Sequence, residues 1–118
     1  MVKVPTLTRI KRLLIDTLAA KTFEMVFGFD GSFATPDDGG AGRPAKTITP
    51  TVTVIDDTAL LLEGNLGAQF SYDEAFREVY VQIKEDDGTF TPVGRYVMRP
   101  FQKGNGNQMN VQILIEVV

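Results

Sequence analysis

Residues 78–98, EVYVQIKEDDGTFTPVGRYVM, decide the fold of this chain. In the first half every second residue is apolar, as in a strand with one buried face: Val79, Val81 and Ile83. Asp86-Asp87-Gly88 is a tight-turn sequence, and an extended pattern resumes over residues 90–98. Two β runs joined by Asp-Gly predict an antiparallel hairpin.

The same period of two recurs on both sides of this hairpin. Residues 23–29 alternate apolar and other side chains, and residues 47–55 are rich in β-branched residues around Pro50, which confines that piece to a sheet edge or a bulge. Glu63-Gly64-Asn65 reads as a turn after a leucine run, with a further one-sided strand expected over residues 66–72. Residues 103–107, KGNGN, predict a last turn before a closing strand.

Near the amino terminus the period changes to that of a helix. Over about residues 6–21, apolar residues recur at steps of three and four, and Pro5 and Thr6 suit a helix start. The apolar stripe consists of Leu7, Ile10, Leu14 and Leu18, with Leu13 beside it. We expect this stripe to cover the core.

These patterns predict a single domain over residues 1–118 that is mainly β, on the borderline of α+β. One amino-terminal amphipathic helix precedes a six- or seven-stranded antiparallel β-sandwich-like domain, whose β-rich body covers residues 47–118. Between the first strand and this body, residues of about 30–46 are rich in Gly, Pro and Asp and predict a long loop. Loops of this length in compact domains are often functional, so it is the first place to look for a contact.

The composition excludes most familiar enzyme chemistry. The chain has 118 residues, a net charge of −3, and neither His nor Cys. Ser-His-Asp relays, thiol nucleophiles, disulfides and Cys/His zinc sites are therefore ruled out. The paired aspartates, as at Asp56-Asp57, lack the alternate spacing of an EF-hand. We expect no catalytic residues, no metal and no cofactor.

The loop contains an imperfect phosphate-binding motif. Residues 40–47, GAGRPAKT, differ at one position from the G-x-x-x-x-G-K-T pattern, and residues 40–45 match G-x-G-x-x-A. Both motifs need a following helix whose amino terminus faces phosphate, but the β-branched residues after Thr47 predict a strand. We interpret the segment as a glycine-rich surface loop that binds no nucleotide.

Charge is unevenly distributed along the chain. Residues 1–21 carry a net +4, and residues 22–118 carry −7. A basic amphipathic helix can lie on DNA or on a membrane, but core cover with solvated charges is the simpler explanation. The remaining alternative is an acidic protein neighbour, including a second copy of this chain, which Arg9, Lys11 and Arg12 would contact. The apolar run before residue 20 is interrupted by Asp16, so we expect no cleaved export signal.

Two further segments are candidates for contact. In the loop these are the charged residues Asp37, Asp38 and Arg43. The closing strand is apolar to its end, with Leu114 and Val118 adding area on the face of Gln112 and Glu116. Such a strand lies either at the centre of a sheet or in a subunit interface, since an exposed one invites pairing with another chain.

Three short motifs, in order, resemble the amino-terminal, baseplate-attaching domains of bacteriophage tail-fibre and tail-collar proteins. They are Asp57-Thr58-Ala59-Leu60, Glu78-Val79-Tyr80-Val81, and the spacing of Arg95, Pro100 and Lys103 after the Asp87-Gly88 turn. Tyr80 stands where that family often has glycine. A fibre of that family would continue into a shaft and a receptor-binding tip where this sequence ends at Val118, so under this resemblance we expect a free-standing adaptor, plug or short collar-type component.

The resemblance implies a structural virion protein of a phage tail, assembled in the host cytoplasm. It implies a homo-oligomer, a trimer or higher ring, that contacts neighbouring tail or baseplate proteins and binds neither nucleic acid nor membrane. The alternative is a carbohydrate- or surface-binding β-sandwich module, in which Phe29, Phe33 and Tyr72 would form the sugar platform.

Overall fold

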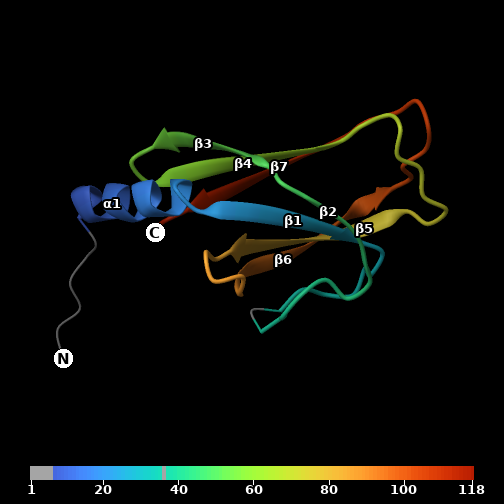
Figure 1. The fold of residues 1–118 in the computed structure, drawn as a ribbon. Helices are drawn as coiled ribbons and strands as arrows, with labels where there is room; N and C mark the ends of the chain where they lie inside the picture. Colours follow the sequence, from blue (N-terminus) through green and yellow to red (C-terminus); the bar gives the residue numbers. More distant parts are fainter. Residues whose placement is uncertain (1–6, 36) are drawn as a thin grey trace.

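Two antiparallel sheets face each other across one hydrophobic core, as the computed structural model shows for residues 7–35 and 37–118 (Figure 1). This confirms the prediction of a mainly β domain with one helix followed by strands. The elements in chain order are α1 (Thr8–Ala19), β1 (Thr22–Gly28), β2 (Pro44–Ile48), β3 (Thr51–Asp56), β4 (Ala59–Leu66), β5 (Phe76–Lys84), β6 (Phe90–Phe101) and β7 (Met109–Glu116).

The predicted hairpin, β5 and β6, forms one half of the four-stranded sheet, whose order is β2-β1-β5-β6, with β6 at the edge. β5 and β6 pair antiparallel, with Tyr80 opposite Arg95. At the turn between them Gly88 has a φ of 87°, a conformation that side chains with a Cβ rarely adopt. β2 begins at Pro44, inside the segment expected to be loop, because its residues pair with the end of β1.

The three-stranded sheet has the order β3-β4-β7. Thr49 and Pro50 separate β2 from β3, so the chain leaves one sheet for the other where proline removes a backbone donor. β7 pairs with β4 and lies at the edge of its sheet. Of the two alternatives for the closing strand, a place at the centre of a sheet is therefore wrong, and a place in a subunit interface stays a prediction. One side of β7 has no neighbouring strand among the described residues.

The turn expected at Glu63-Gly64-Asn65 does not form. β4 continues through Gly64 to Leu66, and the strand expected over residues 66–72 is replaced by turns. A Cβ on Gly64 would lie 2.5 Å from Met25 Sδ and 2.8 Å from Ile48 Cδ1, so the glycine lets side chains of the opposite sheet approach the β4 backbone. Glycine here marks close packing.

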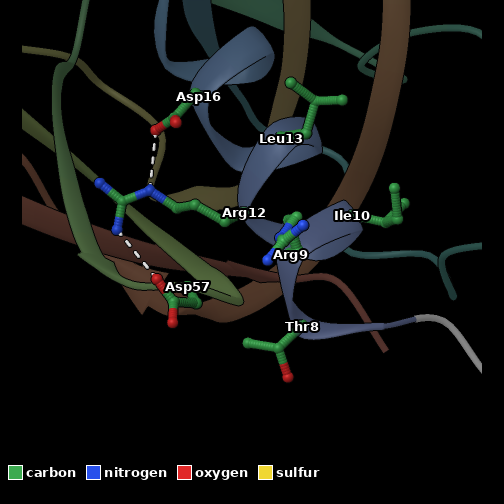
Figure 2. A pocket seen from close by; sticks show the side chains of 7 residues that line it. All are labelled: Thr8, Arg9, Ile10, Arg12, Leu13, Asp16 and Asp57. Carbon is green, nitrogen blue, oxygen red and sulfur yellow. Dashed lines mark hydrogen bonds and ion pairs between the residues drawn. The ribbon is translucent and has the colours of Figure 1, made fainter.

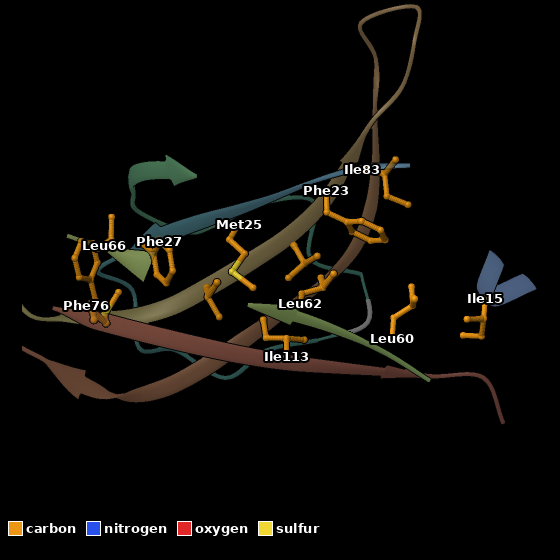
Figure 3. Close-up of a cluster of buried hydrophobic side chains, with 13 residues drawn as sticks. Ile15, Phe23, Met25, Phe27, Leu60, Leu62, Leu66, Phe76, Ile83 and Ile113 are labelled. Carbon is orange, nitrogen blue, oxygen red and sulfur yellow. The ribbon is translucent and has the colours of Figure 1, made fainter. Parts of the chain in front are cut away.

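The core lies between the inner faces of the two sheets (Figure 3). Phe23, Met25 and Phe27 of β1 alternate inward as their period predicted. The other fully buried apolar residues come mainly from β4 and β5, and include Leu60, Leu62, Leu66, Phe76 and Val81. Large side chains from both sheets thus fill one continuous interior.

Helix α1 caps one end of the sandwich and extends beyond it (Figure 1). The expected start at Pro5 and Thr6 lies outside the described residues. Ile15 is its only fully buried residue, with Leu18 and Ala19 partly buried against the core. The prediction that the whole apolar stripe covers the core is wrong: three of its residues, Leu7, Ile10 and Leu14, and the flanking Leu13 are 46–67% exposed.

Replacement of Ile15 by Ala should lower the free energy of unfolding by about 2–4 kcal/mol, because it leaves a cavity at the junction of helix and sandwich. The matched control Leu13→Ala removes a mostly exposed side chain and should change it by less than about 0.5 kcal/mol. Urea unfolding followed by circular dichroism, at a concentration low enough to keep the chain monomeric, measures both. Equal effects would contradict the helix placement.

Candidate functional site

The long loop between β1 and β2 lies beside the four-stranded sheet, away from the three-stranded one (Figure 1). It is built around the carboxylate of Glu78 of β5. Glu78 is fully buried. Its Oε2 accepts backbone N–H groups of Asp30 at 2.7 Å and Arg43 at 2.9 Å, and its Oε1 accepts that of Gly42 at 2.7 Å. One side chain therefore holds both ends of the loop on the sheet.

Arg95 completes this arrangement from the neighbouring strand. Its Nε donates to Glu78 Oε1 at 2.8 Å, while its two terminal nitrogens donate to the carbonyls of Ser32 and Asp30. The guanidinium also lies 3.5 Å from a carboxylate oxygen of Asp38. Since the Arg95 side chain is only 3% exposed, these bonds replace the water that it would otherwise bind. We call Glu78 and Arg95, with the backbone groups they bind, the loop anchor.

The loop anchor stays ionised despite its burial. Burial alone would raise the pKa of Glu78, but the hydrogen bonds from Arg95 and from the N–H groups of Arg43, Asp30 and Gly42 together lower it. The bond to Glu78 raises the pKa of Arg95. Beside them, burial and the negative charge of Asp38 raise the pKa of Tyr80. The pair is therefore a fixed charge pair with no free acid or base.

A glycine makes the close approach of loop and carboxylate feasible. A Cβ on Gly28 would lie 2.5 Å from Glu78 Oε2 and 2.6 Å from the carbonyl oxygen of Arg43. The same strand end is tied by the Phe29 N–H, which donates to that carbonyl at 3.0 Å. Only a residue without a side chain allows β1, the loop and Glu78 to meet here.

The imperfect phosphate-binding motif lies in this anchored segment. The backbone N–H groups of Gly42 and Arg43, which a phosphate site would direct at its ligand, donate to Glu78. Strand β2 takes up the second half of the motif, from Pro44 on, and no helix follows it. The anion in this nest of N–H groups is thus the chain's own carboxylate.

The three candidate residues in the loop have different surroundings. Asp38 accepts the N–H and hydroxyl of Thr35, and these bonds, the backbone one first, lower its pKa. Arg43 forms two hydrogen bonds with the Glu74 carboxylate and lies over the ring of Phe29. Asp37 is exposed. Asp38 and Arg43 therefore hold the loop together, and Asp37 is presented to solvent.

The three candidate residues of the helix have different surroundings. Arg12 binds Asp16 at 2.9 Å and Asp57 at 3.1 Å, which links α1 to the turn before β4 (Figure 2). Arg9 is exposed and lines a surface hollow with Ile10 and Leu13, and Lys11 is half-buried. The structure therefore brings Arg9 beside exposed apolar residues, whereas Arg12 serves to orient the helix.

The two candidate residues of the closing strand are exposed. Leu114 is 51% exposed on the outer face of β7, opposite Leu61 of β4. Val118 is 95% exposed, and the preceding residue Val117 donates its N–H to the Thr58 carbonyl. Both therefore belong to the outer surface of the three-stranded sheet, far in sequence from the helix.

A second buried charge joins the loops at the end of the sandwich opposite α1 (Figure 1). Lys103 is fully buried, and its Nζ donates to the carbonyls of Phe70 at 2.6 Å and Gly104 at 2.8 Å. Its own carbonyl accepts the N–H of Tyr72 at 2.9 Å. Lys103 thereby ties the irregular segment before β5 to the turn before β7.

The aromatic residues proposed for a sugar platform do not form one face. The Phe29 ring stacks on Phe76 at 5.3 Å, and Tyr72 meets Phe76 edge-on at 4.9 Å. Both rings pack against the core, whereas Phe33 is 96% exposed. Two of the three rings thus contribute to internal packing.

The sequence patterns do not predict that Glu78 and Arg95 together form the loop anchor. Alternation placed Glu78 on the face opposite Val79, which reads as solvent-exposed, and only the resemblance singled out Glu78 and Arg95. The available signal was the glycine-rich loop itself, since backbone N–H groups close to a sheet need acceptors. Within residues 7–35 and 37–118 no cluster of three or more acidic residues is placed to hold a metal ion. No helix in that part of the chain is both long and apolar enough to cross a membrane.

Comparisons with protein-family models, with curated proteins and with solved structures find no match to this chain. The site therefore has to be understood from its own geometry. That geometry consists of a loop fixed from inside and two exposed apolar surfaces, on α1 and on the three-stranded sheet.

Replacement of Arg95 by Met should destabilise the fold by about 3–5 kcal/mol, since it leaves the Glu78 carboxylate buried without its cation. The double variant Glu78→Gln/Arg95→Met removes both charges and should recover part of this loss. Chemical unfolding of the three proteins measures both values. An Arg95→Met variant as stable as the wild type would refute the loop anchor.

The loop anchor should make stability sensitive to acid. The pKa of Glu78 is lowered in the folded state, so its contribution is complete above the unfolded value of about 4.3 and is lost as pH falls through the folded value. Thermal unfolding between neutral and strongly acidic pH should therefore show a shallower acid slope for the double variant than for wild type. Asp37→Asn, which alters an exposed carboxylate of the same loop, should keep the wild-type slope.

Proposed function

We propose that this protein is a structural component of a bacteriophage tail that acts by protein–protein contact and self-association. In this proposal it is an adaptor, collar or baseplate-type piece of the virion, assembled in the host cytoplasm into a trimer or higher ring. It acts through shape-matched surfaces and not through catalysis.

One observation carries the proposal most strongly. Besides Asp57 and Asp87, which are exposed, the motifs that carry the resemblance to tail-fibre and tail-collar attachment domains contain the charged residues Glu78, Arg95 and Lys103. These same three are the buried charged residues of the described chain, and each ties a loop to the sandwich. If the residues of the family pattern hold the loops in place, the family shares a structure and not a catalytic site, as expected for structural proteins.

The surface supports the same proposal. Four large aliphatic residues of α1 are exposed together, and so are Ile55 and Leu114 on the three-stranded sheet. Exposed apolar residues in groups are typical of protein–protein contact. The sugar-binding alternative loses support because Phe29 and Tyr72 pack internally.

Mass spectrometry and cryo-EM of virions purified from a phage that encodes this chain test the proposal. We expect the chain in separated tails at a fixed ratio to the other tail proteins, and density for its sandwich there. Detached heads from the same preparation are the control. Absence of the chain from virions would contradict the proposal. Reproducible binding of the absent chain to a glycan array would then support the sugar-binding alternative.

Self-association can be tested on the isolated chain. Multi-angle light scattering at micromolar concentration should give a mass of three or more chains. A monomer at every concentration up to the solubility limit would contradict this part of the proposal.

A further inference from the structure

We infer that the exposed apolar face of α1 packs on the outer face of the three-stranded sheet of a second copy of this chain. The inference names the contact by which the proposed self-association occurs, and it rests on that proposal. Two surfaces far apart in sequence carry it, and they agree in length and carry opposite charge.

The helix presents more apolar surface than its own sandwich covers. Ile15, Leu18 and Ala19 face the body, whereas Leu7, Ile10, Leu13 and Leu14 lie on the adjoining side and are about half exposed or more. A helix of 12 residues is marginal in water without tertiary packing on its apolar face. The uncovered side of α1 is therefore suited to a partner.

The outer face of the three-stranded sheet offers a matching surface. Leu61 and Leu114 lie side by side across β4 and β7, with Thr53 of β3 in the same row. Ile55, at the bulge of β3, is 52% exposed near this row. A hollow of about 590 Å³ lies on these strands, and Thr51, Glu63, Asn110 and Gln112 help to line it. The face is thus apolar at one end and concave and polar at the other.

Charge favours this pairing over a contact between two helices. Strands β3, β4 and β7 contain Asp56, Glu63 and Glu116 and contain no Lys or Arg. The helix carries Arg9 beside the exposed Ile10 and Leu13, and the half-buried Lys11 adds a second positive charge to it. Two copies of α1 would bring like charges together, whereas helix on sheet brings opposite charges together and steers the encounter.

The dimensions also agree. A 12-residue helix is about 18 Å long, and eight-residue strands such as β4 and β7 are about 26 Å long. A helix lying along a sheet face is a standard layer arrangement. Because the two surfaces differ, each copy can bind one neighbour with its helix and another with its sheet, which closes into a ring where the rotation allows it.

Disulfide trapping tests the contact, because the natural chain has no cysteine and each variant therefore carries a single thiol. Leu13→Cys is mixed with a size-tagged Leu114→Cys, and copper–phenanthroline accepts the two electrons released as the two thiols join. The matched control is Phe90→Cys, since Phe90 is 51% exposed, as is Leu114, but lies on the other sheet. We expect the yield of the mixed Leu13–Leu114 disulfide to be about ten times that of the mixed Leu13–Phe90 disulfide, because only the first pair lies in the proposed interface.

Light scattering on Leu13→Asp and Leu114→Asp provides the second measurement. Each should raise the dissociation constant at least about tenfold, with an unchanged circular dichroism spectrum, because a charge replaces a side chain that the contact buries. Phe90→Asp should keep the wild-type mass. Raised salt should weaken the wild-type complex, since opposite charges flank the contact.

The outcomes separate the contact from the proposal on which it rests. Predominant Leu13–Leu13 disulfides, or equal trapping by Leu114→Cys and Phe90→Cys, would overturn the helix-on-sheet contact. Self-association itself would still be supported if light scattering gave an oligomeric mass. A monomeric wild-type chain would overturn both. Detection of the chain in virions decides the tail assignment separately from either result.

Discussion

A carboxylate removed from water stays ionised only where donors surround it, and the Glu78 carboxylate meets this condition on the outer face of the four-stranded sheet. Its donors are Arg95 and the backbone of both ends of the long loop. The requirement explains why Gly28 stands at the end of β1 and why Arg95 lies on the neighbouring strand. Both ends of the segment between β1 and β2 are thereby fixed on the sheet, because one buried ion pair and its backbone donors replace the hydrophobic contacts that the loop lacks.

Sequence patterns predicted the elements whose causes are local. Period-two alternation identified β1, β5 and the closing strand, and Asp-Gly identified the hairpin, since strand faces and tight turns depend on neighbouring residues. Features set by distant contacts were not predicted. Gly64 suggests a turn in the sequence, but the structure needs glycine there because Met25 of the other sheet lies against the β4 backbone. The exposed half of α1 could not be foreseen either, since amphipathicity gives an apolar arc without saying how much of it the same chain covers.

The candidate site residues also fall into two groups, exposed ones and ones that form internal bonds. Arg9, Leu114 and Val118 were singled out from charge and hydrophobicity, and they are exposed. Arg12, Asp38 and Arg43 were singled out on the same grounds, but they form internal bonds that hold the helix and the loop in place. Charge in a sequence therefore indicates where polar contacts are made and does not distinguish internal from external partners. What remains exposed is a basic helix with uncovered leucines and an acidic sheet face, on a body whose loops are fixed by Glu78, Arg95 and Lys103.

Amide hydrogen exchange tests the central role of Glu78 most directly. The N–H groups of Asp30, Gly42 and Arg43 donate to that carboxylate. We predict that at neutral pH they exchange as slowly as strand amides of β1, although all three lie in a loop, whereas those of the neighbouring Gly39 and Gly40 exchange at rates close to an unfolded chain. Rapid exchange at Asp30, Gly42 and Arg43, equal to that of Gly39, would contradict the account.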